Sequence, residues 1–273
     1  MEVYILLLLS ERTEIQFYNN MSQMHHILNE TRYPKNYKPE IDIAVIPWGA
    51  TEAHNYHLPY GTDNYLTQAF AEESARKAAD MNVPVTVLPT IPFGVNTGQL
   101  DIPLTINMNT STQVKVLEDI IESLKIHNVK KLVVFNGHGG NDFKQIIREF
   151  QGKYPDVFIC QLNWYQVIKA SLIFEDTGEH AGEMETSLMM YLFPHLVLPL
   201  KEAGNGHAKE LVFSARKEGW MWAPRPWTKV TRDTGIGDPA KSTVEKGHQY
   251  FEEATGKIAA FLKELHVTSE LYK

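Results

Sequence analysis

Apolar and polar positions follow one another along the chain in blocks that predict a regular succession of strands and helices. Short apolar runs with the length of buried strands cover residues 41–47, 83–89, 131–135 and 157–162. Apolar residues at helical spacing predict helices over residues 63–82, 112–127, 142–151, 180–192 and 242–265. Several of the strands are apolar throughout, which is typical of a largely parallel sheet covered on both faces. The pattern therefore predicts an α/β fold, a three-layer α/β/α sandwich with a mostly parallel sheet.

The length of 273 residues fits one large α/β domain, and no repeat, low-complexity tract or linker divides the chain. We expect residues 29–273 to form a single domain and residues 1–28 to be an N-terminal extension or arm. The apolar run in this arm, residues 5–9, is far shorter than the ~20 residues that span a bilayer. Glu2 stands where a secretory signal carries basic residues, and no small-residue cleavage site follows. We therefore predict no membrane segment and interpret the arm as an extra strand, an added terminal arm or a region translated from an early start codon.

Composition narrows the function classes further. The formal net charge is -7 and no basic stripe is present, which argues against a nucleic-acid partner. The single cysteine, Cys160, excludes an intrachain disulfide and lies within an apolar run, so we expect a buried apolar role rather than a nucleophile. A reducing compartment fits this composition, and we expect a cytoplasmic protein.

Residues suited to binding metal ions follow two of the predicted strands. Glu52 and His54 come shortly after the first strand, and Asp63 follows past a Pro and a Gly that let the chain turn back. His138 comes shortly after the third strand, between glycines. Open α/β sheets keep their ligand crevices at the carboxyl ends of the strands. A carboxylate has two oxygens, so Asp63 is the natural shared ligand of two metal ions, and mixed His and carboxylate ligands suit zinc, manganese or iron.

Each of these residues taken alone is explained more simply, as part of a loop or turn, with Asp63 as the cap of the following helix. The whole set, placed after strands, favours a metal-dependent hydrolase. A third segment surrounds His180 with acidic residues and puts Glu185 in the same predicted helix. Close acids would raise the pKa of His180, which suits proton transfer to a leaving nitrogen. A capped, solvated helix start is the alternative interpretation of this segment.

Three segments of the chain resemble the signature motifs of the creatininase (creatinine amidohydrolase) family. They are Glu52-Ala-His54-Asn-Tyr-His57-Leu-Pro-Tyr-Gly-Thr-Asp63, Asn136-Gly-His138-Gly-Gly-Asn141 and His180-Ala-Gly-Glu-Met-Glu185-Thr-Ser187. Residues 234–247 resemble the tail of the family, and the match runs in family order from about residue 41 to residue 247. The resemblance implies an α/β sandwich, a centre of two divalent metal ions with a bridging hydroxide, and hydrolysis of a C–N bond in a small polar substrate.

The resemblance also implies a ligand set, carried over by position. Glu52 and His138 would bind one metal ion, His54 would bind the other, and Asp63 would bind both. The implied cofactors are two divalent metal ions, zinc first, with manganese or iron as alternatives. The implied partners are a small-molecule substrate and, because members of the family are often hexamers, further copies of the chain in a homo-oligomer.

The catalytic histidine of the family is matched by His180, and its neighbour by Glu179. The match is incomplete at Gly140, where creatinine-cleaving members have a glutamate ligand. The second metal ion then lacks a carboxylate. We expect Glu185 of the third segment to supply it, with Glu183 as the second candidate.

The substrate side of the predicted site departs from the family as well. Creatinine-cleaving members carry a tryptophan where this chain has Asp176, and residues 94–105 replace the usual loop of the family. Asn96 and Gln99 in this loop are candidates for hydrogen bonds to a polar substrate, and a structural role in the loop is equally open. The backbone of the adjacent glycines Gly139 and Gly140 could approach a substrate closely. These departures argue against creatinine itself as the substrate.

We therefore expect a hydrolase that cleaves an amide, lactam or formamide bond. The alternatives on the same metal centre are hydrolysis of a ketosugar or cyclitol and proteolytic maturation of a small peptide. A metal-binding homologue without catalytic activity is the alternative outside the enzymes. Trp220, Trp222 and Trp227 are expected to cover the site or to pack between subunits, and His57 is expected to hold a ligand in place.

Overall fold

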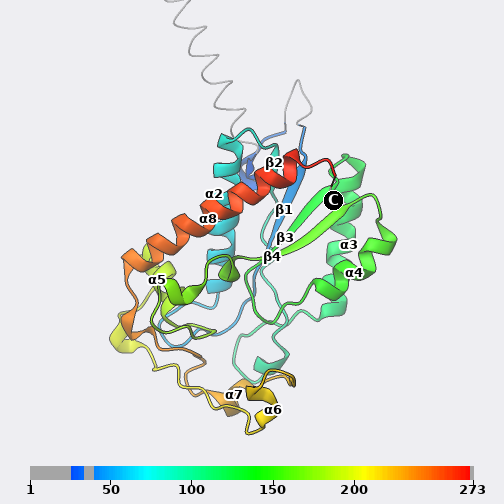
Figure 1. Cartoon of the computed structure of the whole chain (residues 1–273). Helices are drawn as coiled ribbons and strands as arrows, with labels where there is room; N and C mark the ends of the chain where they lie inside the picture. The colour runs from blue at the N-terminus through cyan, green and yellow to red at the C-terminus, as the bar shows by residue number, and fades with distance from the viewer. Residues whose placement is uncertain (1–25, 34–39, 271–273) are drawn as a thin grey trace, which may run out of the picture.

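The structure, a computed structural model, describes residues 26–33 and 40–270 (Figure 1). Its centre is a sheet of four strands in the order β2-β1-β3-β4. The strands are β1 (Ile43–Trp48), β2 (Val85–Val87), β3 (Lys131–Asn136) and β4 (Phe158–Asn163). Every pair of neighbouring strands is parallel, with Ile43 of β1 opposite Val85 of β2 and Lys131 of β3. The predicted α/β fold with a parallel sheet is confirmed.

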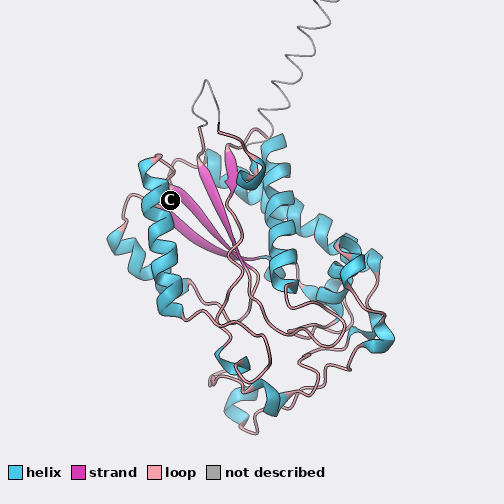
Figure 2. Cartoon of the chain, turned by 180° about the vertical axis from the view of Figure 1, so that it is seen from behind, coloured by secondary structure: helices cyan, strands magenta, loops and turns pink. Residues whose placement is uncertain are grey.

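Helices cover both faces of this sheet, as both views of the chain show (Figure 2). One layer holds α2 (Thr62–Asp80), α5 (Glu183–Leu192) and α8 (Val244–Val267), and the other holds α3 (Thr110–Ile126) and α4 (Lys144–Lys153). Alternate strand residues face the two layers, because side chains of a strand point in turn to opposite sides. Ile43 and Val45 join the core with α2 and α8, whereas Ala44 and Ile46 join the core with α3 and α4. Burying each large aliphatic side chain contributes about 1.5–3 kcal/mol, so the two cores hold the three layers together.

Shorter elements complete the chain. Two short helices, α6 (Ser214–Lys217) and α7 (Trp227–Val230), lie below the carboxyl ends of the strands in Figure 1. The 3₁₀ turns are η2 (Leu28–Glu30), η3 (Thr97–Gln99), η4 (Trp164–Gln166), η5 (Ala170–Leu172), η6 (Pro194–Leu196), η7 (Leu200–Glu202) and η8 (Pro239–Lys241). Among the described residues, no helix combines the length and the apolar character needed to cross a membrane.

Local structure differs from the sequence prediction at two functional positions. The helix expected from His180 begins at Glu183, because the backbone of His180 pairs with Ile236 and Ala181 takes a positive φ of 50°. Asp63 does not cap α2, whose N-cap is Gly61; it lies within the first turn instead. Both residues are therefore free to direct their side chains towards other parts of the chain.

The predicted N-terminal arm, residues 1–28, lies largely outside the described residues. Of its last residues, Ile27 forms an isolated parallel bridge with Val87 of β2. The arm therefore meets the domain at the edge of the sheet, beside β2.

The carboxyl ends of β1 and β3 lie side by side at the point where the order of the strands reverses. The connection through α2 leads from β1 to β2 on one face of the sheet, whereas α3 leads from β2 back across to β3 on the other face. The loops after β1 and β3 therefore diverge, which is the arrangement that forms ligand sites in open α/β sheets. Glu52 and His54 lie in the loop after β1, and His138 lies in the loop after β3.

Gly247 lies where α8 crosses α5, the helix that carries Glu185. A Cβ on Gly247 would lie 2.1 Å from the carbonyl oxygen of Ser187, whereas a Cβ on Gly256 of the same helix would meet nothing within 4 Å. We predict that Gly247→Ala lowers the free energy of unfolding by about 1–3 kcal/mol, because the two helices must move apart. The control Gly256→Ala should raise it by about 1 kcal/mol through helix propensity. Chemical denaturation measures both values, and equal effects of the two substitutions would contradict this packing.

Candidate metal centre

Carboxylates and imidazoles from several segments gather at the carboxyl ends of β1 and β3. They are Glu52 and His54 after β1, Asp63 in the first turn of α2, His138 after β3, His180 in the loop before α5, and Glu185 in the first turn of α5. All are buried, and none is more than 9% exposed. Charged groups are rarely buried to this extent unless they are paired or bind a metal ion.

Asp63 stands between two groups of these side chains. Its Oδ1 lies 3.1 Å from Nε2 of His54, and its Oδ2 lies 3.0 Å from Nδ1 of His138. With Glu52 and His138 it forms one group whose ligand atoms are all within 4.8 Å of one another, and with His54 and Glu185 it forms another. One carboxylate thus links two possible metal positions through its two oxygens.

The histidines of the centre share one hydrogen-bonding pattern. Nδ1 of His54 lies 3.1 Å from the carbonyl oxygen of Glu52, Nε2 of His138 lies 3.1 Å from that of Val95, and Nε2 of His180 lies 2.9 Å from that of Ala53. A carbonyl oxygen only accepts hydrogen bonds, so each of these nitrogens carries the proton and donates it. The other nitrogen of each ring is directed towards the carboxylates. Histidines that bind metal ions are commonly held in this way.

The electrostatics of the centre follow from burial and from the close approach of opposite charges. Burial disfavours protonation of His54 and His138, but Asp63 and Glu52 outweigh it and raise the pKa of His54 to about 10 and that of His138 well above its usual range. Burial likewise disfavours ionisation of Asp63 and Glu52, but the imidazoles hold the pKa of both carboxyls below their usual values. Protons on the imidazoles thus balance the carboxylates.

This charge pattern fits divalent cations. The two carboxylates, Glu52 and Asp63, carry negative charge that neutral imidazoles would leave unbalanced. The imidazoles of His54 and His138 therefore hold an extra proton each. Burial raises the pKa of Glu185 to about 7, so a further carboxylate is available once positive charge is nearby. Metal ions bind the deprotonated forms of these ligands and release the protons. The donor set of imidazole nitrogens and carboxylate oxygens suits transition metals such as zinc and manganese.

Comparison with known proteins places this arrangement in a family. The profile of the Creatininase family, described as creatinine amidohydrolase, matches residues 29–262. The chain belongs to the creatininase family. A solved candidate creatinine amidohydrolase from Bacteroides fragilis is 40% identical, with a TM-score of 0.86, and the match covers 91% of this chain and 99% of that one.

Curated relatives in the creatininase family carry different names. Creatinine amidohydrolase of Pseudomonas putida is 26% identical over 57% of this chain and 66% of its own length. For 3-dehydro-scyllo-inosose hydrolase of Thermotoga maritima the identity is 28%, over 58% of this chain and only 52% of the relative. Mycofactocin precursor peptide peptidase of Mycolicibacterium smegmatis is 24% identical over 82% of this chain and 85% of its own length. The relatives are hydrolases named for different substrates, so the substrate of this chain has to be inferred from its own site.

Gly140 occupies the position at which creatinine-cleaving members of the creatininase family were expected to have a glutamate. A Cβ there would lie 2.3 Å from the carbonyl oxygen of Val95 and 2.4 Å from Nε2 of His138. The hydrogen bond between His138 and Val95 therefore fills the space that a side chain would need. This position cannot supply a ligand in this member of the family.

Glu185 and Glu183 lie in different surroundings. Oε2 of Glu185 lies 3.9 Å from Nε2 of His54 and accepts a hydrogen bond of 2.6 Å from the backbone N–H of Ala181. Glu183 is paired with Lys246 and accepts hydrogen bonds from the backbone at the end of the preceding loop. Of the two candidates, the structure brings only Glu185 to the centre.

The residues expected on the substrate side take up several positions. Gln99 is buried, and its Nε2 donates to Oε2 of Glu52, so it holds a side chain of the centre. Asn96 is also buried and donates to the carbonyl oxygen of Ile106, 3.0 Å away within its own loop. Gly139 and Gly140 are exposed beside the centre.

His180 differs from the prediction in its electrostatics. Burial, and then the positive charge of His54, lower its pKa to about 4, so the expected rise in pKa was wrong. Two of the acids near His180 in sequence, Glu179 and Glu183, face other partners. The side chain of Glu179 is 60% exposed and forms an ion pair of 2.7 Å with Arg225, outside the buried centre. His180 is therefore neutral at pH 7, and its free Nδ1 faces Oε1 of Glu52 at 3.8 Å.

Two further side chains lie beside the centre. The ring of Trp227 lies 4.7 Å from that of His180, whereas Trp220 and Trp222 are 72% and 75% exposed. His57 is buried, and its Nε2 lies 2.8 Å from Oγ1 of Thr186 in α5, so it ties the loop after β1 to α5. Burial lowers the pKa of His57 to about 4, and it stays neutral.

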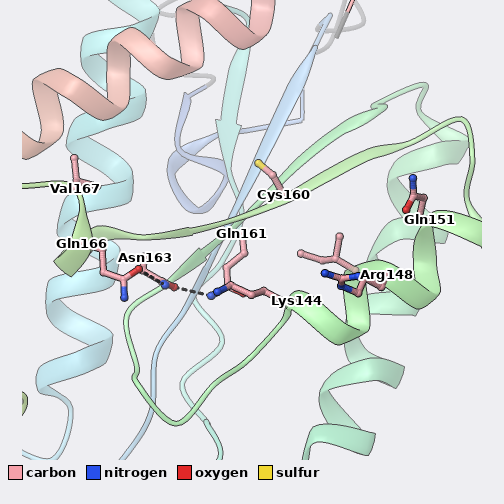
Figure 3. Close-up of a pocket in the computed structure, with 9 residues that line it drawn as sticks. Lys144, Arg148, Gln151, Cys160, Gln161, Asn163, Gln166 and Val167 are labelled. Atoms are coloured by element: carbon pink, nitrogen blue, oxygen red, sulfur yellow. Dashed lines mark hydrogen bonds between the residues drawn. The ribbon is translucent and has the colours of Figure 1, made fainter. Parts of the chain in front are cut away.

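A cavity of about 560 Å³ lies elsewhere, between α4 and β4 (Figure 3). Its lining includes Cys160 and the polar side chains of Gln161 and Asn163, and it contains no residue of the metal centre. Burial raises the pKa of Cys160 to about 12, so its thiol stays protonated and is a poor nucleophile. Cys160 packs against the core as an apolar side chain, but it is half-buried and not fully buried as predicted.

Sequence reasoning missed the groups that hold the centre from outside. The carbonyl oxygens of Ala53 and Val95 orient two histidines, and Arg225 approaches from a distant loop to pair with Glu179. Backbone carbonyls have no sequence signature. The loop that returns to the centre late in the chain is marked in the sequence only by its tryptophans. They suggest that the loop covers the site, but the sequence does not show which tryptophan contacts the centre.

Adjacent glycines in the loop after β3 test the crowding at His138. We predict that Gly140→Ala lowers the affinity for zinc or manganese at least about tenfold, because the new Cβ displaces His138 from its carbonyl partner. A Cβ on Gly139 would meet nothing within 4 Å, so Gly139→Ala should leave the affinity within about twofold of the parent value. Isothermal titration calorimetry measures both affinities. Equal losses in the two variants would mean that the loop as a whole, and not the contact at His138, controls binding.

Proposed function

We propose that the chain is a hydrolase that cleaves a C–N bond in a small amide, lactam or formamide at a centre of two divalent cations. The observation that carries this proposal is the buried carboxylate of Asp63, with one oxygen beside His54 and the other beside His138. Membership of the creatininase family and the names of its relatives support an amide as the substrate. The exposed backbone at Gly139 and Gly140 offers hydrogen bonds to a small polar molecule.

The ligand set we propose divides the centre in two. Glu52 and His138 would hold one cation, His54 and Glu185 the other, and Asp63 both, with Gln99 fixing the carboxylate of Glu52 from behind. Zinc is our first choice, with manganese or iron as alternatives, because mixed imidazole and carboxylate ligands suit all of them. When bound, such cations polarise a substrate carbonyl and lower the pKa of water towards ~7.

We propose that His180 transfers the proton. Its Nε2–H donates to the carbonyl oxygen of Ala53, which leaves the lone pair of Nδ1 facing the centre. A pKa of about 4 keeps this nitrogen unprotonated at neutral pH, so that it can accept a proton from attacking water. The same nitrogen can then return the proton to the leaving nitrogen of the amide. Glu179 points away from the centre, and we assign it no step in the transfer.

We further propose that the chain forms a cytoplasmic homo-oligomer whose single domain spans residues 29–273. The extent of the family match supports this domain. Three large apolar side chains are exposed within residues 212–222, namely Val212 (88%), Trp220 (72%) and Trp222 (75%). Large apolar side chains exposed together support contact with another copy of the chain. Light scattering on the purified protein measures the number of subunits.

Asp63→Asn tests the shared ligand. We predict about two equivalents of transition metal for each parent chain by elemental analysis. The variant should lose affinity by more than about 100-fold, because even partners outside the ligand set often contribute 10–100-fold. Asp119→Asn, an exposed carboxylate on α3, is the matched control and should keep both equivalents. A metal-free, folded and active parent protein would overturn the proposal.

His180→Gln separates proton transfer from metal binding. We predict that turnover of an amide found in a small-compound screen falls about 10²–10⁴-fold, since this is the usual contribution of a general acid–base group. The metal content should not change. Loss of one metal equivalent would instead identify His180 as a ligand, which its place in a group with Glu52 and His54 also allows. Unchanged turnover with full metal content would show that the proton is transferred by another group.

A further inference from the structure

The metal centre is almost closed to solvent, although a substrate must reach it. All its side chains are at most 9% exposed. Residues 224–230, which include α7, contact the loop that carries His180 and the loop that contains η3. We call these residues the strap.

One edge of the strap contacts the loop that carries His180. The ring of Trp227 meets that of His180 edge-on, at 4.7 Å and an interplanar angle of 68°. Nη1 of Arg225 lies 2.7 Å from Oε2 of Glu179, the residue before His180. The guanidinium of Arg225 also lies 5.5 Å from the centre of the Trp227 ring. Arg225 therefore connects an ion pair at the surface to the tryptophan at the centre.

The other edge of the strap contacts the loop that contains η3. Oγ1 of Thr228 donates to Oδ2 of Asp101. The backbone approaches so closely that a Cβ on Gly98 would lie 2.2 Å from the carbonyl oxygen of Arg225. Gln99, the next residue, holds Glu52 of the centre. The strap thus spans from the loop of His180 to the loop that supports Glu52.

A cavity of about 960 Å³ lies beyond the strap. Its wall includes Glu179 and Arg225, and also Ile236, whose backbone pairs with His180. The cavity and the metal centre therefore share the strap and the residues around His180 as a common wall. A volume of this size is ample for a small polar molecule.

We propose that the strap is a gate between this cavity and the metal centre, with the ion pair of Arg225 and Glu179 as its latch. This inference rests on the metal centre of the proposed function. With the latch closed, Trp227 is held against His180 and the centre is sealed. With the latch open, Trp227 swings away and a substrate passes from the cavity to the centre. Glu179 then serves access and not proton transfer.

The position of the latch suits repeated opening. The side chains of Arg225 and Glu179 are 35% and 60% exposed, so water solvates both when they part. Ion pairs at such exposed positions stabilise their closed form only slightly. Loops that close active sites open on a microsecond to millisecond timescale, and a weak latch is consistent with such motion.

The exchange of metal ions tests the gate without a known substrate. The zinc-loaded protein is mixed with excess chelator, and the release rate is measured from the absorbance of the chelate; uptake by the metal-free protein is measured separately. A gate controls entry and exit alike. We predict that Arg225→Ala accelerates both rates by about 1.5- to fivefold and leaves the zinc Kd unchanged. Lys125→Ala removes the partner of Asp156 at the end of α3, an exposed ion pair that does not line the cavity. It is the matched control and should change neither rate.

A second variant opens the gate by a different means. Gly98→Ala places a Cβ against the strap and should accelerate uptake and release by more than about fivefold, because the strap must move aside. Gly152→Ala in α4, where a Cβ would meet nothing within 4 Å, is its control.

The outcomes separate the gate from the metal centre itself. Faster release without faster uptake would mean that the variants weaken the ligands, and the gate would be rejected. Unchanged rates in both variants, with zinc still bound, would reject the gate and leave the proposed function standing. If the parent protein binds no metal ion, the proposed function fails and takes the gate with it.

Discussion

The carboxylate of Asp63 is the constraint on which the rest of the centre depends. It is buried in the first turn of α2, with one oxygen 3.1 Å from His54 and the other 3.0 Å from His138. These histidines come from the loops that follow β1 and β3. The contact therefore joins the two loops at the point where the order of the strands reverses. A buried carboxylate in this position is costly unless positive charge surrounds it. Protons on the imidazoles supply that charge, and divalent cations would supply it better.

Backbone carbonyls make the arrangement rigid. Each histidine of the centre donates its outer N–H to a carbonyl oxygen, so the rings are oriented before any ligand binds. The contact between His138 and Val95 also leaves no room for a side chain at Gly140. The turn at Ala181 brings Glu185 to the centre, and we propose that it supplies the second carboxylate instead. A different position in the chain thus offers the same chemistry.

The sequence predicts the layers well, because strands covered on both faces are apolar and helices repeat at their own period. It also predicts the ligand candidates, since the carboxyl ends of parallel strands meet at one edge of the sheet. It fails where contacts between loops decide the structure. The start of α5 is displaced by the pairing of His180 with Ile236. The acids near His180 in sequence were expected to raise its pKa, yet Glu179 faces Arg225 and burial lowers the pKa instead.

The central claim is that two cations share Asp63. Diffraction from crystals of the zinc- or manganese-loaded protein, measured on both sides of the metal absorption edge, tests this most directly. We predict two anomalous peaks on either side of the Asp63 carboxylate, one beside Glu52 and His138 and the other beside His54 and Glu185. A single peak that does not contact Asp63, or two peaks bound to other residues, would contradict the account.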